Sequence, residues 1–131
     1  MEIYNLTAKD LMRSDVKRIS KNKTLAEAVA LMGNFKVSSL IIEPENENDA
    51  CGIITGKDIV EVLFSERVGW KSFLVEEVMS KPAITANANL SIANCQQLMR
   101  IVGVRRLPIV DGDKVVGVLS YTDIFMRLLE K

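Results

Sequence analysis

The sequence predicts an α+β fold made of two copies of one unit. Matching residues recur 67 positions apart up to position 40 and 65 positions apart from position 52 on; the pairs include Met12/Met79, Leu31/Leu98, Leu40/Leu107, Gly52/Gly117 and Asp58/Asp123. The spacing changes within a polar stretch, where a duplicated fold tolerates an insertion. Within each copy, short apolar runs alternate with segments of helical periodicity, which is typical of mixed strands and helices.

The most regular stretch occurs in both copies, as Gly-Ile-Ile-Thr-Gly-Lys-Asp-Ile at residues 52–59 and as Gly-Val-Leu-Ser-Tyr-Thr-Asp-Ile at residues 117–124. Each predicts a buried strand that ends at a hydroxyl residue, Thr55 or Ser120, and then a helix. The hydroxyl and the aspartate three residues later have the spacing of a capping box, which satisfies free backbone N–H groups. The same helix end can hold an anion.

In the first copy, Thr24 and Glu27 form a capping box that begins the first long helix. The polar run Glu43–Asp49 predicts a hairpin loop. The expected elements are a turn at Thr7–Met12, an extended piece at Val16–Ile19, a helix from Thr24 that includes Phe35, strands at Ser39–Ile42 and Cys51–Ile54, and a helix at Lys57–Ser65.

After a joint at residues 66–74, the same order returns, and Asp-Gly-Asp at 111–113 predicts a tight hairpin. The expected elements are a turn at Val75–Met79, an extended piece at Ala83–Thr85, a helix at Ser91–Val102, strands at Arg106–Val110 and Lys114–Leu119, and a helix at Tyr121–Leu129. The repeats are assigned to residues 1–66 and 67–131. Since units of about sixty residues are marginal alone, we expect them to form one globular pair.

The composition, 48% hydrophobic and 26% charged, is ordinary for a globular protein. Lys+Arg and Asp+Glu both number 17, which argues against a nucleic-acid partner. No apolar run is long enough to span a bilayer and no signal peptide is evident, so we expect a cytoplasmic protein without a membrane partner. Because Cys51 and Cys95 lie far apart and histidine is absent, we expect buried, reduced thiols and no metal site.

The ordered set of motifs resembles the CBS domain, which is named for cystathionine β-synthase. A turn that ends in Met, a helix that ends in Leu-Met, the strand Val-Arg-Arg-Leu-Pro-Ile-Val-Asp and the stretch at residues 117–124 carry the resemblance, which covers residues 7–130. Two copies resemble a tandem CBS pair, or Bateman module, here expected to stand alone. The resemblance implies two β-α-β-β-α repeats that pack through their sheets with pseudo-two-fold symmetry.

By this resemblance, the chain is a regulatory module and not an enzyme. Such a pair binds adenosine-containing ligands in clefts between its repeats, forms a homodimer and passes a conformational change to a partner protein. The expected ligands are AMP, ADP or ATP, ahead of NAD or S-adenosylmethionine, with no required cofactor. No catalytic residue is assigned.

The resemblance implies that Asp58 and Asp123 bind ribose hydroxyls and that Thr55 and Ser120 contact phosphate, with Thr122 on the same helix end. A carboxylate can accept from both hydroxyls of a cis-diol. The spacing is equally that of a plain capping box, which needs no ligand. Both interpretations remain open, and they are compatible.

Other candidate contacts surround these two motifs. Arg105 and Arg106 adjoin a strand and suit phosphate, although a solvated pair or a pair bonded to acids such as Asp111 is an equal alternative. Val16 and Ile84 are the candidates for the apolar slot that an adenine ring needs.

The first copy departs from the second at these positions. Ser38 and Ser39 stand where the second copy has its arginines, and Ile41 stands where it has Pro108. The two clefts should therefore differ, and the cleft with the arginines is the better candidate for a charged nucleotide. The incomplete first copy also motivates an alternative function, a structural or interaction dimer in which one or both clefts bind no nucleotide.

Two further clusters are interpreted as structural. The acidic run Glu43–Asp49 lacks the ordered spacing of a calcium loop and predicts a solvated loop. The paired methionines suit core packing better than a soft-metal site; they are Met12, Met32, Met79 and Met99. No nucleophile–base set or phosphate-binding P-loop supports an enzyme.

Overall fold

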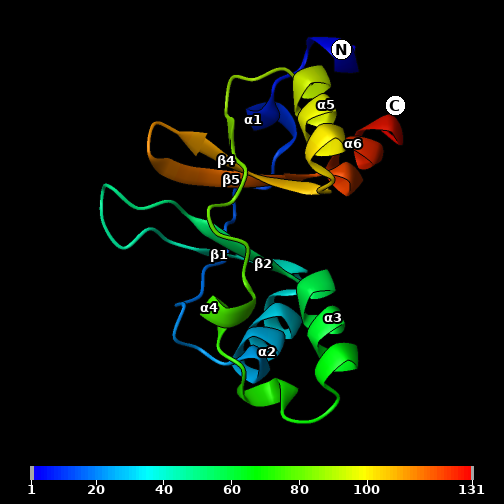
Figure 1. The fold of residues 1–131 in the computed structure, drawn as a ribbon. Helices are drawn as coiled ribbons and strands as arrows, with labels where there is room; N and C mark the ends of the chain where they lie inside the picture. The colour runs from blue at the N-terminus through cyan, green and yellow to red at the C-terminus, as the bar shows by residue number, and fades with distance from the viewer. Residues whose placement is uncertain (1, 131) are drawn as a thin grey trace. The chain divides into compact units, whose positions relative to one another are not determined.

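The computed structural model describes residues 2–130 (Figure 1). The chain forms two compact units. Unit 1 combines the N-terminal segment up to Val16 with the chain from Ile84 on, and unit 2 is the continuous stretch Lys17–Ala83. Both contain helices and strands, which confirms the predicted α+β class.

Unit 2 is built on a two-stranded antiparallel sheet, β1 (Ser39–Ile42) and β2 (Gly52–Thr55). Helices cover one face of this sheet (Figure 1). They are α2 (Leu25–Phe35), α3 (Gly56–Glu66), the 3-10 turn η2 (Trp70–Ser72) and α4 (Val75–Val78). The core is aliphatic and consists of Leu25, Ala28, Met32, Leu40, Ile42, Ile54, Ile59 and Val75.

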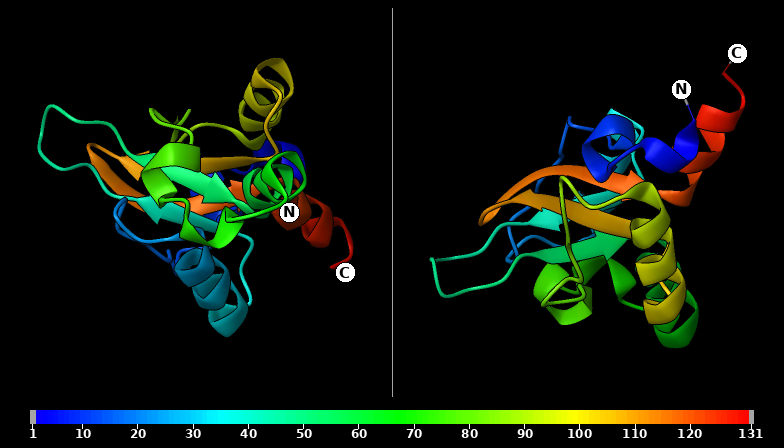
Figure 2. Two further views of the ribbon diagram at one scale, coloured as in Figure 1. Left: turned by 60° about the horizontal axis from the view of Figure 1, so that its bottom comes forward. Right: turned by 90° about the horizontal axis from the view of Figure 1, so that it is seen from above.

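Unit 1 is built on a three-stranded sheet in the order β3 (Ala86–Asn87), β4 (Arg106–Asp111), β5 (Lys114–Ser120). β3 runs parallel to β4, and β5 runs antiparallel to it. The helical elements are η1 (Ile3–Asn5), α1 (Ala8–Leu11), α5 (Ile92–Val102) and α6 (Tyr121–Leu128), and α6 leaves directly from the end of β5 (Figure 2). The core lies among Leu6, Ala8, Ala86, Ala88, Ile92, Cys95, Met99, Leu107, Ile109 and Leu119.

The opening segments of the two copies are exchanged between them. The N-terminal segment packs on the rest of the second copy, where Ala8 N–H donates to Leu90 O at 2.8 Å and Arg13 pairs with Val118. The opening segment of the second copy packs on the rest of the first, where Ile53 pairs with Ser80. The compact units therefore divide the chain differently from the sequence repeats at 1–66 and 67–131.

The predicted helices and hairpin strands are confirmed, with small shifts at their ends, whereas neither predicted extended piece forms a strand at its predicted residues. The capping box at Thr24 is present, and Ser91 caps α5. The extended pieces are the least regular elements. In the first copy only Arg18 forms a bridge, to Ile41, and in the second copy the strand begins at Ala86, where pairing with β4 becomes possible.

The predicted burial of sulfur-containing residues is also confirmed. Cys51 and Cys95 are buried, free thiols, and burial raises the pKa of both. Met32 and Met99 lie in the two cores, and Met12 and Met79 pack against them. Across residues 2–130, no helix has the length and apolar character to cross a bilayer.

The prediction of a solvated acidic loop is confirmed, because the run Glu43–Asp49 lies in the loop between β1 and β2 and most of its residues are exposed. Three of its carboxylates are also ion-paired, which the sequence did not predict. Their partners are Arg18, Lys21 and Lys81, which lie far from the loop in the sequence.

Candidate functional site

In unit 1, one face of the β4–β5 hairpin carries the candidate contacts. Leu107, Ile109 and Leu119 point into the core. Because side chains alternate along a strand, the opposite face carries Arg106 and Pro108. Cross-strand pairing sets Arg106 opposite Ser120. A cation and the start of the capping box therefore lie side by side at this end of the sheet.

Asp123 is held at the first turn of α6 through one of its two carboxylate oxygens. Its Oδ2 accepts from Ser120 N–H and from the Ser120 hydroxyl, both at 2.9 Å, and Asp123 N–H donates to Ser120 Oγ at 3.2 Å. Within residues 2–130, Oδ1 accepts no hydrogen bond. The predicted capping box is therefore real, and it leaves one carboxylate oxygen for a ribose diol. The Ser120 hydroxyl hydrogen is already used by Asp123.

The N-terminus of α6 retains one uncommitted donor. Tyr121 N–H donates to Arg105 O at 3.1 Å, and Asp123 N–H is capped by Ser120. The Thr122 N–H between them donates to none of the described residues, and the Thr122 side chain is exposed. Thr122 can thus offer an anion both its N–H and its hydroxyl.

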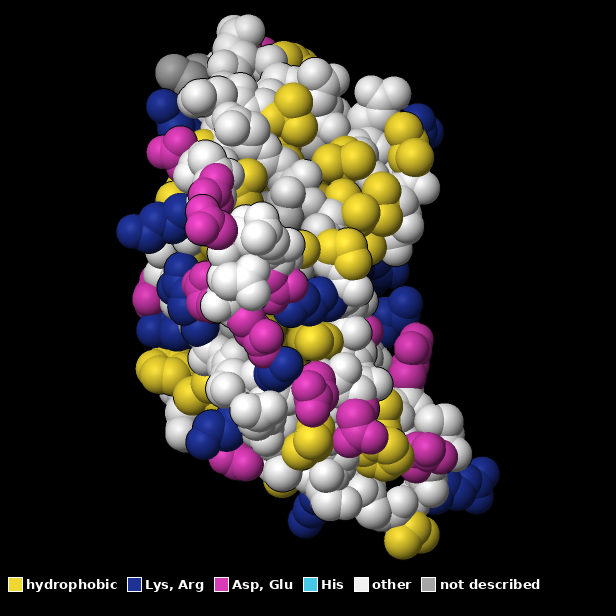
Figure 3. Space-filling model, turned by 60° about the vertical axis from the view of Figure 1, so that its left-hand side comes forward, with side chains coloured by type: hydrophobic (Ala, Val, Ile, Leu, Met, Phe, Trp, Pro, Cys, Tyr) yellow, Lys and Arg dark blue, Asp and Glu magenta, His cyan; other side chains and the backbone are white. Residues whose placement is uncertain are grey.

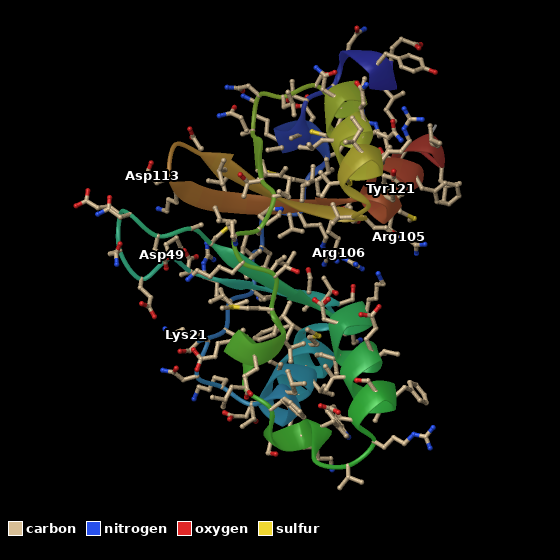
Figure 4. All side chains as sticks on the ribbon, viewed as in Figure 1. Lys21, Asp49, Arg105, Arg106, Asp113 and Tyr121 are labelled. Carbon is tan, nitrogen blue, oxygen red and sulfur yellow. The ribbon has the colours of Figure 1, made fainter. Side chains whose placement is uncertain are left out.

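The two arginines differ in exposure. Arg105 is exposed and Arg106 is half-buried. Figure 4 shows both beside Tyr121, at the end of the β4–β5 hairpin that is opposite to Asp113. Asp111 lies at that far end of β4, about 16 Å along the strand from Arg106, so the alternative of an ion pair with Asp111 is wrong.

Ile84 and Pro108 have different surroundings. Ile84 lies two residues before β3, outside the paired part of the sheet. Ile84 is 43% exposed, as an open apolar contact requires. Pro108 is fully buried, so its side chain is the least accessible of the candidates.

Unit 2 repeats the geometry with other side chains. Asp58 Oδ2 accepts from Thr55 N–H at 2.8 Å, and Asp58 N–H donates to Thr55 Oγ1 at 3.2 Å. Gly56 N–H donates to Ser38 O at 2.9 Å, as Tyr121 does to Arg105 O in unit 1. The pairing of Ser39 with Thr55 likewise matches Arg106 with Ser120 in the other unit.

One cation in unit 2 was missed by the sequence interpretation. Lys57 occupies the position of Thr122, on the first turn of α3, and its side chain is 80% exposed. Glu61 lies 3.7 Å away, one helical turn later. The first copy therefore does carry positive charge at its helix end. The motif Thr-Gly-Lys-Asp already contained this lysine.

The remaining candidate, Val16, is the last residue of the N-terminal segment of unit 1. It is half-buried, and the chain after it lies beside β1 in unit 2, where Ile41 N–H donates to Lys17 O at 2.9 Å.

A cavity of about 420 Å³ adjoins Asp58 in unit 2. Its lining includes three carboxylates, those of Asp58, Glu61 and Glu77. This acidic lining is unsuited to phosphate. The residues described by the structure contain no group of three His, Cys, Asp or Glu side chains that could hold a metal ion.

Comparison of the sequence with known protein families finds the same two repeats. The model of the CBS domain matches residues 8–65 and again residues 75–130. The chain belongs to the CBS domain family. It contains a tandem CBS pair, as the motifs predicted.

Individual relatives agree with this assignment. The CBS domain-containing protein YhcV of Bacillus subtilis is 33% identical over 119 residues, which cover 90% of this chain and 82% of that protein. The hexameric CBS-CP12 protein from bloom-forming cyanobacteria matches with a TM-score of 0.89 and 34% identity over 93% of this chain and 70% of its own. The CBS domain pair of protein MJ0100, solved with 5'-methylthioadenosine and S-adenosyl-L-methionine, matches with a TM-score of 0.78 and 25% identity over 95% of each chain.

Proposed function

We propose that this CBS pair is a regulatory module that binds an adenosine-containing nucleotide through the second copy. Asp123 Oδ1 would accept the ribose hydroxyls, and the Thr122 N–H, Arg105 and Arg106 would receive the phosphate. The observation that carries the proposal is the pairing of Arg106 with Ser120. It sets a guanidinium next to a helix end that retains a free donor and a free carboxylate oxygen.

The chemistry of the site favours AMP, ADP or ATP over S-adenosylmethionine. Two guanidinium groups and a helix N-terminus attract negative charge, and a sulfonium ligand brings positive charge instead. The complex of the MJ0100 pair with two adenosine compounds supports an adenosine moiety in general. The ligand would shift the equilibrium between two arrangements, because it binds one of them more tightly, and a partner protein would detect that shift.

A second candidate function is an interaction module, and the surface of α6 favours it. Four apolar side chains of its outer surface are exposed: Phe125 at 57%, Met126 at 52%, Leu128 at 62% and Leu129 at 59%. An apolar cluster of this kind commonly marks a protein–protein contact. We propose that the chain forms a homodimer, and sedimentation of wild type against Phe125→Lys/Leu128→Lys tests this.

Titration calorimetry with AMP, ADP, ATP, NAD and S-adenosylmethionine distinguishes the two functions. Saturable binding that Asp123→Ala weakens supports nucleotide sensing. A folded wild-type protein that binds none of the five ligands supports the interaction module. Product release from ATP at steady state would instead indicate an enzyme.

A further inference from the structure

The acidic loop of unit 2, Glu43–Asp49, is held by cations on both of its sides. Arg18 forms an ion pair with Glu43, and Lys21 forms one with Glu45. Lys81 Nζ lies 2.7 Å from Asp49 Oδ2. We name Arg18, Lys21 and Lys81 the basic set. Lys21 and Asp49 lie at the same end of unit 2 (Figure 4).

The basic set reaches the loop from two separate segments. Arg18 pairs with Ile41 on the outer side of β1, and Lys21 follows on the same segment. Lys81 comes from the segment that flanks β2, where Ala83 N–H donates to Cys51 O at 2.9 Å. The loop that joins β1 to β2 is therefore enclosed by positive charge from both flanks.

The loop carboxylates are coupled to one another as well as to the cations. Glu45 N–H donates to Asp49 Oδ2 at 2.9 Å, the oxygen that also binds Lys81. The ion pair with Glu45 raises the pKa of Lys21, and the ammonium of Lys81 lowers the pKa of Asp49. Figure 3 shows acidic and basic side chains interleaved on one face of the molecule.

The second copy lacks the basic set, although its own hairpin turn carries Asp111 and Asp113. The 67-residue shift replaces Arg18 by Thr85, Lys21 by Ala88 and Glu43 by Val110. Lys81 is matched by Ser14. Because the second copy forms its hairpin without these groups, the fold does not require them. The basic set is an addition specific to the first copy.

A cavity next to the basic set has room for an anion. A cavity of about 400 Å³ opens where Arg18 and Lys21 meet the start of the acidic loop, and Glu43 and Glu45 complete its lining. The ion pairs around it are partly exposed, with side-chain exposures of 34% and 52% for Lys21 and Glu45. Pairs in such surroundings are weak, so a multivalent anion can compete for the same cations.

We propose that the basic set is an anion-binding site whose present occupant is the acidic loop of the chain itself, and that a polyphosphate exchanges with this loop. The site lies at the hairpin end of the β1–β2 sheet, whereas Thr55 and Asp58 lie at its other end. The basic set belongs to unit 2 and shares no residue with the nucleotide contacts proposed above, which belong to unit 1. Exchange would release the loop from Arg18 and Lys21 together.

The test measures binding of inorganic triphosphate to the full chain by calorimetry, with Glu45→Gln and Glu47→Gln as matched variants. Both remove one loop carboxylate, but only Glu45 is paired with the basic set; Glu47 forms no ion pair within residues 2–130. We expect Glu45→Gln to bind triphosphate severalfold more tightly than wild type and Glu47→Gln to bind as wild type does. Equal affinities of the two variants would overturn the proposal.

Two further variants show where the anion binds. Arg18→Gln/Lys21→Gln should abolish the gain in the Glu45→Gln background, whereas Arg105→Ala, which removes a proposed phosphate contact of unit 1, should not lower triphosphate binding. Loss of triphosphate binding in Arg105→Ala would place the anion at the nucleotide contacts and overturn the proposal. If a variant fails to fold, hydrogen exchange of the wild-type loop decides: triphosphate should accelerate exchange at residues 43–50 more than sodium chloride of equal ionic strength. An equal effect of both salts would again overturn it.

Discussion

Gly117 lies directly against the side chain of Met12. A Cβ added to this glycine would stand 2.7 Å from Met12 Cγ and 3.0 Å from Arg13 O. The first copy repeats the contact, because a Cβ at Gly52 would stand 3.2 Å from Met79 Sδ. Each motif glycine thus makes room for a methionine from the opening segment of the other copy.

Gly117→Ala should destabilise the protein by about 1–3 kcal/mol, because the new methyl group overpacks against Met12 and a backbone oxygen. Gly52→Ala should cost less, since its neighbours are farther away. Gly33→Ala is the control: nothing lies within 4 Å of its added Cβ, and it stands inside α2, so it should be neutral or stabilising. Urea unfolding measures all three, and equal losses would contradict the contact.

Leu6→Ala should loosen unit 1 selectively. Leu6 is 3% exposed and belongs to the core of the second copy, although it precedes the first. The substitution should cost about 2–5 kcal/mol and raise hydrogen exchange in α5 and β4 more than in α2 and β1. Leu25→Ala, in the other core, should give the reverse pattern. If Leu6→Ala instead raised hydrogen exchange in α2, the packing of the N-terminal segment on the second copy would be contradicted.

The ion pair between Asp49 and Lys81 should make stability depend on acid pH. Lys81 lowers the pKa of Asp49 below its usual 3.8, so the pair contributes fully above the unfolded-state pKa and its contribution is lost as pH falls through the lower folded-state value. Wild type should therefore exceed Asp49→Asn in stability by a constant margin above about pH 5, and that margin should shrink below about pH 4. Urea unfolding at several pH values measures it. If the stability difference between wild type and Asp49→Asn stayed constant down to the pH of acid denaturation, the contribution of the ion pair would be contradicted.

Arg105→Ala should weaken nucleotide binding more than Lys57→Ala does. A charge-assisted hydrogen bond contributes about 1.5–3 kcal/mol, so we expect an affinity loss of about tenfold to a hundredfold for ATP. Lys57 stands at the helix end of the other copy and serves as the control. Since Arg105 is exposed, its loss should leave thermal stability nearly unchanged. Equal losses for the two variants would indicate that both copies bind.

Much of the local structure follows from the sequence because its causes are local. The Thr24, Thr55 and Ser120 caps depend on residues three positions apart, and all three are present as predicted. The Asp-Gly-Asp turn needs a positive φ at its centre, and Gly112 has φ 64°.

The exchange of segments and the charge pairs around the acidic loop were not predicted. Periodicity shows that Met12 is apolar and paired with Met79, but not which sheet it packs on. Likewise, the acids at 43–49 indicate a loop, whereas their partner Lys81 lies 32 positions from Asp49 and is brought near only by the fold. The helix-end contacts of Asp123 were predictable as a cap; their use by a ligand remains a prediction.

The most direct test of nucleotide sensing is calorimetric titration of ATP and AMP into wild type and Asp123→Ala. The Asp123→Ala variant loses a cap contact as well, so its folding is checked by circular dichroism first. We expect about micromolar binding of one nucleotide per chain to wild type and at least a tenfold loss in the variant. No binding to folded wild type, or unchanged affinity in a folded Asp123→Ala variant, would contradict the account.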